Sequence, residues 1–464
     1  MKRNDSANKI TLLNILSTFI LQGIAFLTTP IFTRLLGTSQ FGVYAVFNSW
    51  VLILTCIMGL GIHSAIGTGL YTFRERYLAF RNSILLFSTL VCVIELIIII
   101  CLRNILANLL ELNDMLILII GITAFGHYIV NFAHNSFIYE KKAWSNLILS
   151  ISVSIFTVVL SIILILEMDT ELRYLARIYG VTISYVIIGI ILWLLLFLEK
   201  PETIKSEYYK YGFIVGFPIV FHALSQNILG QSDRVMMQFY GISTSEIGIY
   251  SLFYSFCAVL STILSALNNS WCPFYYDDIN EGKWERINQK SKNYIELFTV
   301  LSVGFLLLAR ELSYVMADTT YWMGIDVIPI LTLAVYFTFM YQFPVNFEFY
   351  HKKTKIIAIG TMGAGVTNII LNAVMIPCWG MYGAAIATAL SYLGLFFAHY
   401  LIVSKMKEHK YHLKMQVFVP GVIGLLLGVI LFYFLSELWV LRWGCGLVIG
   451  GFEMYRMYKR KSIF

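Results

Sequence analysis

Fourteen apolar runs of membrane-crossing length dominate this chain of 464 residues. A bilayer core about 30 Å thick requires about 20 apolar residues per helix, and backbone groups inside it must be hydrogen-bonded within the protein. The runs do not alternate in polarity as the strands of a membrane barrel do. An all-α, multi-pass membrane protein is therefore predicted. Its expected crossings are residues 10–36, 41–65, 82–102, 115–137, 145–167, 174–198, 212–240, 247–269, 293–310, 325–349, 356–377, 383–404, 415–436 and 438–455.

The same sequence unit occurs twice. Gly37 and Gly241 lie 204 residues apart, and Tyr139-Glu140-Lys141-Lys142 returns 211 residues later as Tyr350-His351-Lys352-Lys353. Each copy holds six apolar runs, an even number, so both copies begin on the same side of the membrane. Transporters are often built from two such related halves around a central site. We therefore expect two parallel six-helix bundles around a central cavity, related by a pseudo-two-fold axis along the membrane normal.

The chain divides into four parts on this basis. We predict an N-terminal six-helix bundle at 1–198, a charged cytoplasmic linker at 199–211 and a second six-helix bundle at 212–404. Residues 405–464 then supply a further pair of helices and a basic cytoplasmic tail. No loop is long enough to hold a soluble catalytic domain, which argues against an enzyme.

Positive charge is concentrated on one side of the predicted membrane. With fourteen crossings, 26 of the 33 Lys and Arg residues fall in the termini and alternate loops that share the side of the N-terminus. Cytoplasmic loops carry such an excess, so both termini are predicted to be cytoplasmic. The net charge of +7 is explained by this bias and does not indicate nucleic-acid binding.

The first helix of each copy carries a polar stripe. At about 100° per residue, the polar side chains of each stripe fall on one face of their helix. A polar face at membrane depth is costly toward lipid, so it is expected to line an aqueous cavity or to hydrogen-bond a neighbouring helix. The predicted cavity-lining residues are Asn14, Thr18, Gln22, Thr29, His222, Gln226 and Asp233.

Two arginines lie within these same helices. The planar guanidinium can hold phosphate oxygens in a bidentate fashion, so Arg34 and Arg234 are candidates for contact with an anionic group. Alternatively, Arg34 extends its side chain to the membrane surface, and Arg234 forms a structural ion pair with Asp233.

Two acidic residues within the apolar runs are candidates for ion coupling. A buried carboxylate such as Glu95 or Asp233 can take up a proton, whereas a hydrogen-bonded structural role is the alternative for Glu95. Glu348 lies near the cytoplasmic end of its run and is expected to face the interface. No metal-binding or phosphate-loop motif occurs in a fitting context, so neither a metal nor a cofactor is expected.

Several motifs resemble those of a known family. Pro30 to Gly37 reads Pro-Ile-Phe-Thr-Arg-Leu-Leu-Gly and is followed by Phe41-Gly42-Val43-Tyr44. The second copy carries Ser232 to Met236, followed by Gly248-Ile249-Tyr250, and Gly380 to Thr388 opens a later helix. These segments resemble polysaccharide-unit flippases of the Wzx type, within the multidrug/oligosaccharidyl-lipid/polysaccharide exporter superfamily.

The resemblance implies a fold, a substrate and a driving force. It implies two bundles in a V around a central cavity, and transport of undecaprenyl-diphosphate-linked oligosaccharide units for capsule, O-antigen or exopolysaccharide assembly. Arg34 and Arg234 would contact the diphosphate, and a proton or sodium gradient would drive alternating access. The partners implied are that lipid-linked oligosaccharide, membrane lipids, and a polysaccharide polymerase with its chain-length machinery, all in the bacterial cytoplasmic membrane.

Other functions remain open at this stage. A lipid II flippase and a multidrug cation exporter share the fold of this superfamily. The two arginines argue against a cation exporter, because a cationic drug favours acidic cavity residues. A membrane polysaccharide polymerase would carry a large outer loop with catalytic residues, and the sequence has no such loop.

Overall fold

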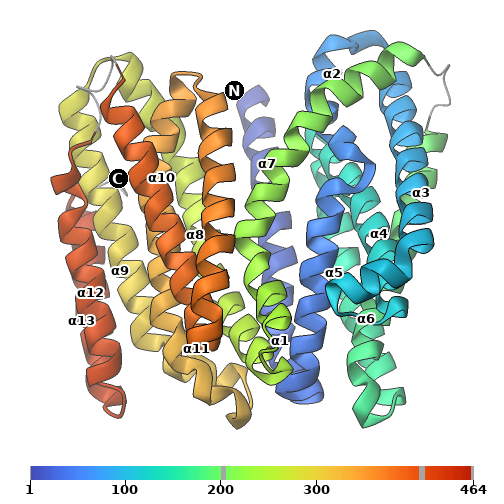
Figure 1. Cartoon of the computed structure of the whole chain (residues 1–464). Helices are drawn as coiled ribbons and strands as arrows, with labels where there is room; N and C mark the ends of the chain where they lie inside the picture. The colour runs from blue at the N-terminus through green and yellow to red at the C-terminus, as the bar shows by residue number, and fades with distance from the viewer. Residues whose placement is uncertain (1, 200–204, 407–412, 461–464) are drawn as a thin grey trace. The chain divides into compact units, whose positions relative to one another are not determined.

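The computed structural model describes residues 2–199, 205–406 and 413–460, and over this range it contains helices but no strand. Figure 1 labels the α-helices in chain order. In the first half they are α1 (Lys2–Ile57), α2 (Ile66–Thr72), α3 (Tyr77–Leu110), α4 (Asp114–Tyr139), α5 (Ala143–Glu167), α6 (Arg173–Leu198) and α7 (Ser206–Phe239). In the second half they are α8 (Thr244–Asn280), α9 (Trp284–Met316), α10 (Ile328–Tyr350), α11 (Thr354–Ser404), α12 (Val419–Phe434) and α13 (Trp439–Arg460). Short 3₁₀ segments are η1 (Met58–Ala65), η2 (Arg74–Arg76), η3 (Thr170–Leu172), η4 (Thr319–Val327) and η6 (Met415–Val417).

The two longest helices are each interrupted by a glycine. In α1 the backbone leaves helical geometry at Gly37, with φ 64° and ψ 179°, and in α11 it does so at Gly380, with φ 52° and ψ −128°. Side chains with a Cβ rarely adopt these angles, so glycine is the residue that allows the break. The sequence predicted a boundary between two crossings close to each of these positions.

A second kind of break follows α1. Gly59, Leu60 and Gly61 have φ values of 61°, 50° and 64°, so three successive residues are left-handed. Leu60 has a Cβ and adopts this region at a cost of about 1–2 kcal/mol. Close packing supports the break, since a Cβ added at Gly216 of α7 would lie 2.7 Å from the carbonyl oxygen of Gly61.

Ten helical segments of the described chain are long and apolar enough to cross a membrane. They are Gly23–Thr72, Arg74–Leu110, Asp114–Tyr139, Ala143–Glu167, Thr170–Leu198, Ser206–Phe239, Thr244–Asn280, Thr319–Tyr350, Thr354–Ser404 and Met415–Phe434. The prediction of an all-α, multi-pass membrane protein is therefore confirmed. Two of the segments, with 50 and 51 residues, exceed the length of a single crossing. The expected count of fourteen stays a prediction.

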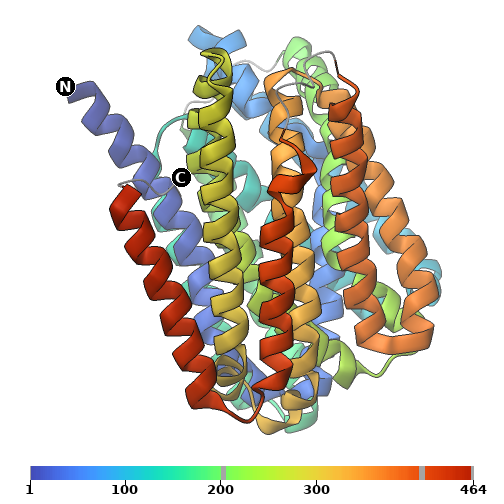
Figure 2. The same ribbon diagram turned by 90° about the vertical axis from the view of Figure 1, so that its left-hand side faces the viewer.

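Charged residues on α9 and α13 pair with one another. Arg442 of α13 bonds Glu311 of α9, and Arg456 bonds Glu296. Figure 2 shows α13 running alongside α9. These four charges are therefore paired between α9 and α13. Neither helix is among the ten apolar segments, and both carry charged residues.

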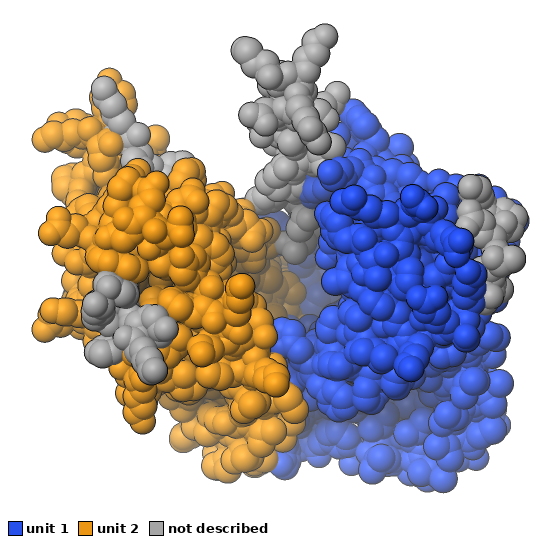
Figure 3. Space-filling view, turned by 90° about the horizontal axis from the view of Figure 1, so that it is seen from above, with its two compact units in different colours: residues 1–248 blue, residues 249–464 orange. Residues whose placement is uncertain are grey.

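The chain forms two compact units, Met1–Gly248 and Ile249–Phe464, coloured separately in Figure 3. Helix α7 packs with the first unit, against α1, η1 and α3. The boundary at residues 248 and 249 separates units that pack internally. The predicted domains 1–198, 212–404 and 405–464 instead follow the sequence duplication and the segment after it. The repeat boundaries stay a prediction, and residues 200–204 of the predicted linker lie outside the described residues.

Residues 38–42 and 244–248 meet in a reciprocal contact within the first unit. Ser39 Oγ lies 2.6 Å from the Thr244 hydroxyl. The equivalent residues 206 positions apart form the same bond, with Ser245 Oγ donating to the Thr38 hydroxyl at 2.7 Å. Exchange of equivalent residues across a contact is the signature of two-fold symmetry. The duplication is thus visible as a local symmetric contact.

The glycines of the same segments complete this contact. A Cβ added at Gly42 would overlap the carbonyl of Thr244, and one added at Gly248 would overlap the carbonyl of Thr38. Small residues allow helix backbones to approach closely in this way. The sequence had matched Gly42 with Gly248 as equivalent positions, but their direct contact was not predicted.

Candidate functional site

The predicted polar stripe of α1 is partly engaged by neighbouring helices. Asn146 of α5 donates to Asn14 Oδ1 at 3.0 Å, and its own Oδ1 lies 2.6 Å from His134 Nδ1 of α4. Asn146 is buried, and Asn14 and His134 are half-buried. Asn14 therefore joins α1 to α5 and α4 through hydrogen bonds, which is the alternative role that the sequence allowed.

The remaining stripe residues of α1 have different surroundings. Thr29 is half-buried and its hydroxyl donates to Ala25 O, one turn earlier, at 2.9 Å. The side chains of Thr18 and Gln22 lie outside the described residues. Arg34 is exposed, with Nη1 3.5 Å from Pro30 O.

The stripe of α7 passes from exposed to buried along the helix. His222 is half-buried and Gln226 is exposed, whereas Asp233 is fully buried and Arg234 is only 6% exposed. The stripe therefore begins on an accessible part of α7 and ends among packed helices. Cavity lining by the residues of both stripes stays a prediction.

Arg234 contacts acceptor groups of its own helix, α7, and one of these acceptors also bonds a residue of α1. Its Nη1 donates to Gly230 O at 2.8 Å and lies 3.4 Å from Gln231 Oε1. Ser49 of α1 donates to that same Oε1 at 3.1 Å. A buried guanidinium needs such acceptors. Arg234 is thus buried and engaged by acceptors of the protein itself.

Glu95 lies at the break that follows α1. It is half-buried, and its Oε2 accepts a hydrogen bond from the backbone N–H of Gly59 at 2.9 Å. The left-handed turn removes that N–H from the helical hydrogen-bond ladder, and the carboxylate satisfies it. Glu95 thus has a structural role, and its predicted role in ion coupling stays a prediction.

An ion-pair cluster that the sequence did not predict joins α3, α4 and α6. Arg81 is fully buried, and its Nη1 lies 2.9 Å from Glu140 and 2.8 Å from Glu199. Lys142 bonds the same two carboxylates, each at 2.8 Å. The repeated Tyr139-Glu140-Lys141-Lys142 motif marked this place, but only as a basic loop.

The charges of this cluster shift one another's ionisation. Burial alone would raise the pKa of Glu199, but hydrogen bonds from Lys142 and Arg81 outweigh it and hold this pKa below its ordinary value. Burial would lower the pKa of Lys142, but its bonds to Glu140 and Glu199 raise that pKa. Both groups therefore stay charged over a wide pH range.

Glu348 is not at the interface. The expectation that it faces the cytoplasmic surface is wrong, because the side chain is 0% exposed and its Oε2 lies 2.7 Å from Nδ1 of the equally buried His399. The carboxylate has a partner from α11 that proximity in the sequence did not reveal. The error came from treating the last turn of α10 as exposed.

Comparison with known proteins agrees with this architecture. The polysaccharide biosynthesis protein family matches residues 8–277, which is more than half of the chain. The chain belongs to this family. Two proteins of Haemophilus influenzae are similar to it. An uncharacterized membrane protein is 24% identical, covering 84% of this chain and 95% of the relative, and Lsg locus putative protein 1 is 21% identical, covering 72% and 82%.

Solved transporters share the fold of this chain. The lipid II flippase MurJ in an inward closed conformation matches with a TM-score of 0.73 at 15% identity, covering 97% of this chain and 99% of MurJ. An inward-facing multidrug resistance MATE family transporter of the MOP superfamily matches with a TM-score of 0.64 at 14% identity, covering 91% and 99%. The superfamily fold expected from the sequence motifs is confirmed.

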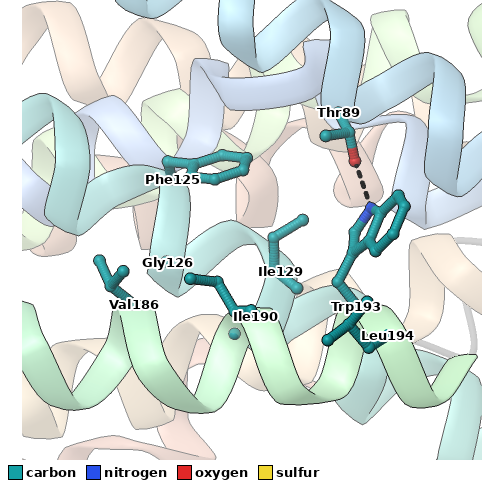
Figure 4. A pocket seen from close by; sticks show the side chains of 9 residues that line it. Thr89, Phe125, Gly126, Ile129, Val186, Ile190, Trp193 and Leu194 are labelled. Atoms are coloured by element: carbon teal, nitrogen blue, oxygen red, sulfur yellow. Dashed lines mark hydrogen bonds between the residues drawn. The ribbon is translucent and has the colours of Figure 1, made fainter.

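The first unit of this family member also holds an apolar crevice, shown in Figure 4. Its volume is about 190 Å³, and side chains from α3, α4 and α6 line it. Trp193 closes one end by donating from Nε1 to the Thr89 hydroxyl at 2.9 Å. The indole N–H is thereby satisfied, so the crevice presents an almost wholly apolar wall.

Proposed function

We propose that this protein translocates undecaprenyl-diphosphate-linked oligosaccharide units from the cytoplasmic to the outer leaflet of the bacterial cytoplasmic membrane. These units would serve capsule, O-antigen or exopolysaccharide assembly. The observation that carries the proposal is the match of residues 8–277 to a polysaccharide biosynthesis family in a chain folded like a lipid II flippase. A polysaccharide is assembled from units that must cross the membrane, and a flippase fold performs such a crossing without covalent chemistry.

The polar residues of α1 and α7 fit this task. Lipid-linked sugars need hydrogen-bonding groups along their path, while the lipid tail can remain in the bilayer. Arg234 is suited to the diphosphate because a guanidinium holds phosphate oxygens through parallel N–H bonds. Since Arg234 is buried in this structure, we propose that the contact forms at a different stage of an alternating-access cycle.

We infer that an ion gradient drives the cycle, with protons or sodium as the coupling ion. Both termini would lie in the cytoplasm, as the distribution of Lys and Arg indicates. Fusion of a reporter that is active only outside the cytoplasm to residue 464 tests this orientation. Reporter activity there would contradict it.

Deletion of the gene tests the substrate. Lipid-linked oligosaccharide units should accumulate facing the cytoplasm and the surface polysaccharide should disappear, with both defects reversed by the intact gene. Surface polysaccharide of normal amount and chain length in the deletion strain would contradict the proposal. Accumulation of lipid II instead would indicate a peptidoglycan-precursor flippase, and sensitivity to cationic drugs alone would indicate a multidrug exporter.

A further inference from the structure

The second compact unit contains a carboxylate–imidazole pair that the proposed transport path does not use. Glu348 lies within one turn of the end of α10 at Tyr350, and His399 lies near the end of α11. Both side chains are 0% exposed, and Glu348 Oε2 is 2.7 Å from His399 Nδ1. An ionisable pair with no exposed surface is rare in a protein interior unless it is structurally required or functional.

Each member of the pair has one unsatisfied polar atom. Over the described part of the chain, neither Glu348 Oε1 nor His399 Nε2 has a hydrogen-bond partner, and both atoms are buried. A structural hydrogen-bond network would be expected to satisfy these atoms. At a site that gains and loses a proton, such atoms can bind a proton or a water molecule during part of the cycle.

The backbone around the pair is shaped to admit the imidazole. A Cβ added at Gly360 of α11 would overlap the His399 ring. The ring of Tyr341 on α10 lies edge-on to His399, with centroids 5.2 Å apart. The imidazole is therefore confined by α10 and by both halves of α11, with its Nε2 edge directed toward Gly360.

Other titratable groups lie on the elements that hold the pair, and on α11 these include Lys355 and Tyr400, with Lys405 at its end. On α10 the nearest titratable groups are Tyr341 and, just past its end, His351, whose Nδ1 lies 2.9 Å from Phe347 O. The backbone N–H of Lys353 donates a hydrogen bond to the backbone oxygen of Glu348 at 2.9 Å. α12 carries no Asp, Glu, Lys, Arg or His.

Two carboxylates on the other helices around α10 have cationic partners of their own. On α8, Asp278 bonds Lys290 of α9 at 2.6 Å. On α9, Glu296 bonds Arg456 of α13. These two carboxylates are therefore neutralised by cations other than His399.

The chemistry of such a pair makes its charge sensitive to one proton. With one proton shared between the two side chains the pair is neutral, whether as an ion pair or as two uncharged groups. Removal of that proton leaves a net charge of −1, and addition of another leaves +1. A net charge in the interior costs several kcal/mol, so either change favours a conformation that admits water.

We propose that Glu348 and His399 form an occluded proton-binding site, whose loading and release drive the conformational cycle of transport. This assignment rests on the proposed function for its role in driving substrate movement, but proton binding itself does not. Because the pair lies within one turn of the end of α10 that is predicted to be cytoplasmic, opening of that end would expose it first. The site lies in the second unit, apart from Glu95 and Asp233 of the first.

The first arm of the test needs no transport substrate. Wild-type protein in liposomes is subjected to a pH jump, and infrared difference spectra record conversion between carboxylate and carboxylic acid. We expect a carboxylic acid band that is lost in Glu348→Gln and shifted in His399→Gln. The matched control His351→Gln, one turn away, should keep the band. Spectra identical in wild type, Glu348→Gln and His399→Gln would overturn the proposal.

The second arm measures coupling with the lipid-linked oligosaccharide extracted from the deletion strain. A gradient of one pH unit, exchanged at one proton per molecule, sustains an accumulation ratio of about tenfold. We expect Glu348→Gln and His399→Gln to reduce this ratio to one while still equilibrating the lipid between leaflets. Gradient-driven accumulation retained in both variants would overturn the proposal.

The two arms separate this inference from the proposed function. A titrating band assigned to Glu348 with no movement of the oligosaccharide by wild type would leave the proton site standing and reject the substrate. Because both members of the pair are substituted separately, a variant that does not fold leaves the other variant to test the proton site. Loss of thermal stability in both with an unchanged band in the folded fraction would show a structural pair only, and would overturn the proposal.

Discussion

Gly42 and Gly248 lie against each other at equivalent positions of the two sequence copies. A Cβ added to either glycine would lie 2.9 Å from the backbone nitrogen of the other. The hydroxyl pairs Ser39–Thr244 and Thr38–Ser245 flank this contact symmetrically. The start of the second copy therefore packs on the start of the first through the residues that duplication made identical.

Substitution at either glycine is expected to destabilise the protein. Gly42→Ala and Gly248→Ala each place a methyl group against the backbone carbonyl of the opposite segment, and overpacking of this kind costs about 1–3 kcal/mol. Thermal unfolding of the purified protein in detergent measures the effect as a lower Tm. Since both changes disrupt one contact, the double variant should lose less stability than the sum of the single variants.

Gly23→Ala is the matched control in α1. No atom lies within 4 Å of a Cβ added there, so its Tm should equal or exceed that of the wild type. Equal Tm values for Gly23→Ala and Gly42→Ala would show that the close approach has no energetic weight.

The Arg81 cluster is expected to fix the ends of α3, α4 and α6. Arg81→Met removes a buried cation and leaves Glu140, 8% exposed, paired with Lys142. Breaking a buried ion pair costs about 3–5 kcal/mol, so the Tm should fall markedly. The exposed Arg74 provides the control, since Arg74→Met should leave the Tm unchanged. A similar Tm for both variants would argue against the cluster as a structural element.

Stability should depend on acid pH through Glu199. Its pKa is held below the ordinary value once burial is outweighed by Lys142 and Arg81. A carboxylate with a lowered folded-state pKa adds stability above its unfolded-state pKa, and this contribution is lost as pH falls through the folded-state value. The Tm of wild type should therefore decline on acidification more than that of Glu199→Gln. Parallel declines in both proteins would exclude this contribution.

Lys142 is expected to make stability depend on pH in the alkaline range, with stability lost as pH rises. Burial acts to lower its pKa, but bonds to Glu140 and Glu199 raise it above the ordinary value. Its contribution is present below the unfolded-state pKa and is lost as pH rises through the folded-state value. Lys142→Met should thus have a lower Tm than wild type at neutral pH, and the difference should narrow at strongly alkaline pH. A difference that stays constant with pH would contradict the charge-based account.

Arg234 is expected to be needed for export beyond its part in packing. Arg234→Ala should reduce surface polysaccharide by at least about tenfold, since a charge-assisted phosphate contact is worth about 1.5–3 kcal/mol, and Arg234→Lys should restore part of it. The exposed Arg103 is the control, and Arg103→Ala should export normally. Normal export by both Arg234 variants at equal protein level would reject the diphosphate contact.

Two substitutions at Glu95 distinguish a structural role of this residue from a role in ion coupling. Glu95→Gln keeps an oxygen that can accept the Gly59 N–H, whereas Glu95→Ala removes it and should lower the Tm by leaving a buried donor unsatisfied. If Glu95 also carries a coupling proton, Glu95→Gln should fold normally and fail to respond to an imposed pH gradient. Gradient-driven transport by Glu95→Gln would leave only the structural role.

The sequence predicted the membrane fold well because apolar length and glycine position act locally. Runs of about 20 apolar residues must become helices in lipid, and Gly37 and Gly380 lie at expected boundaries between crossings. The repeat was likewise readable, because equivalent residues keep their types and spacing.

Contacts between distant segments were not predictable in this way. The pairing of Glu348 with His399, 51 residues later, depends on how α10 packs against α11. Arg81 looked like one more cytoplasmic cation, although its carboxylate partners come from the ends of α4 and α6. The burial of Asp233 and Arg234 similarly reflects packing around α7, which a single-helix polar stripe does not encode.

The central claim is that the protein moves a lipid-linked oligosaccharide across a bilayer. The most direct measurement reconstitutes the purified protein in liposomes with the lipid-linked oligosaccharide from the deletion strain in both leaflets, and then adds an external glycosidase that cannot enter. We predict that the enzyme cleaves nearly all of the oligosaccharide in vesicles that contain the protein, and only the outer-leaflet share in protein-free vesicles. Cleavage restricted to the outer-leaflet share in both would contradict the account.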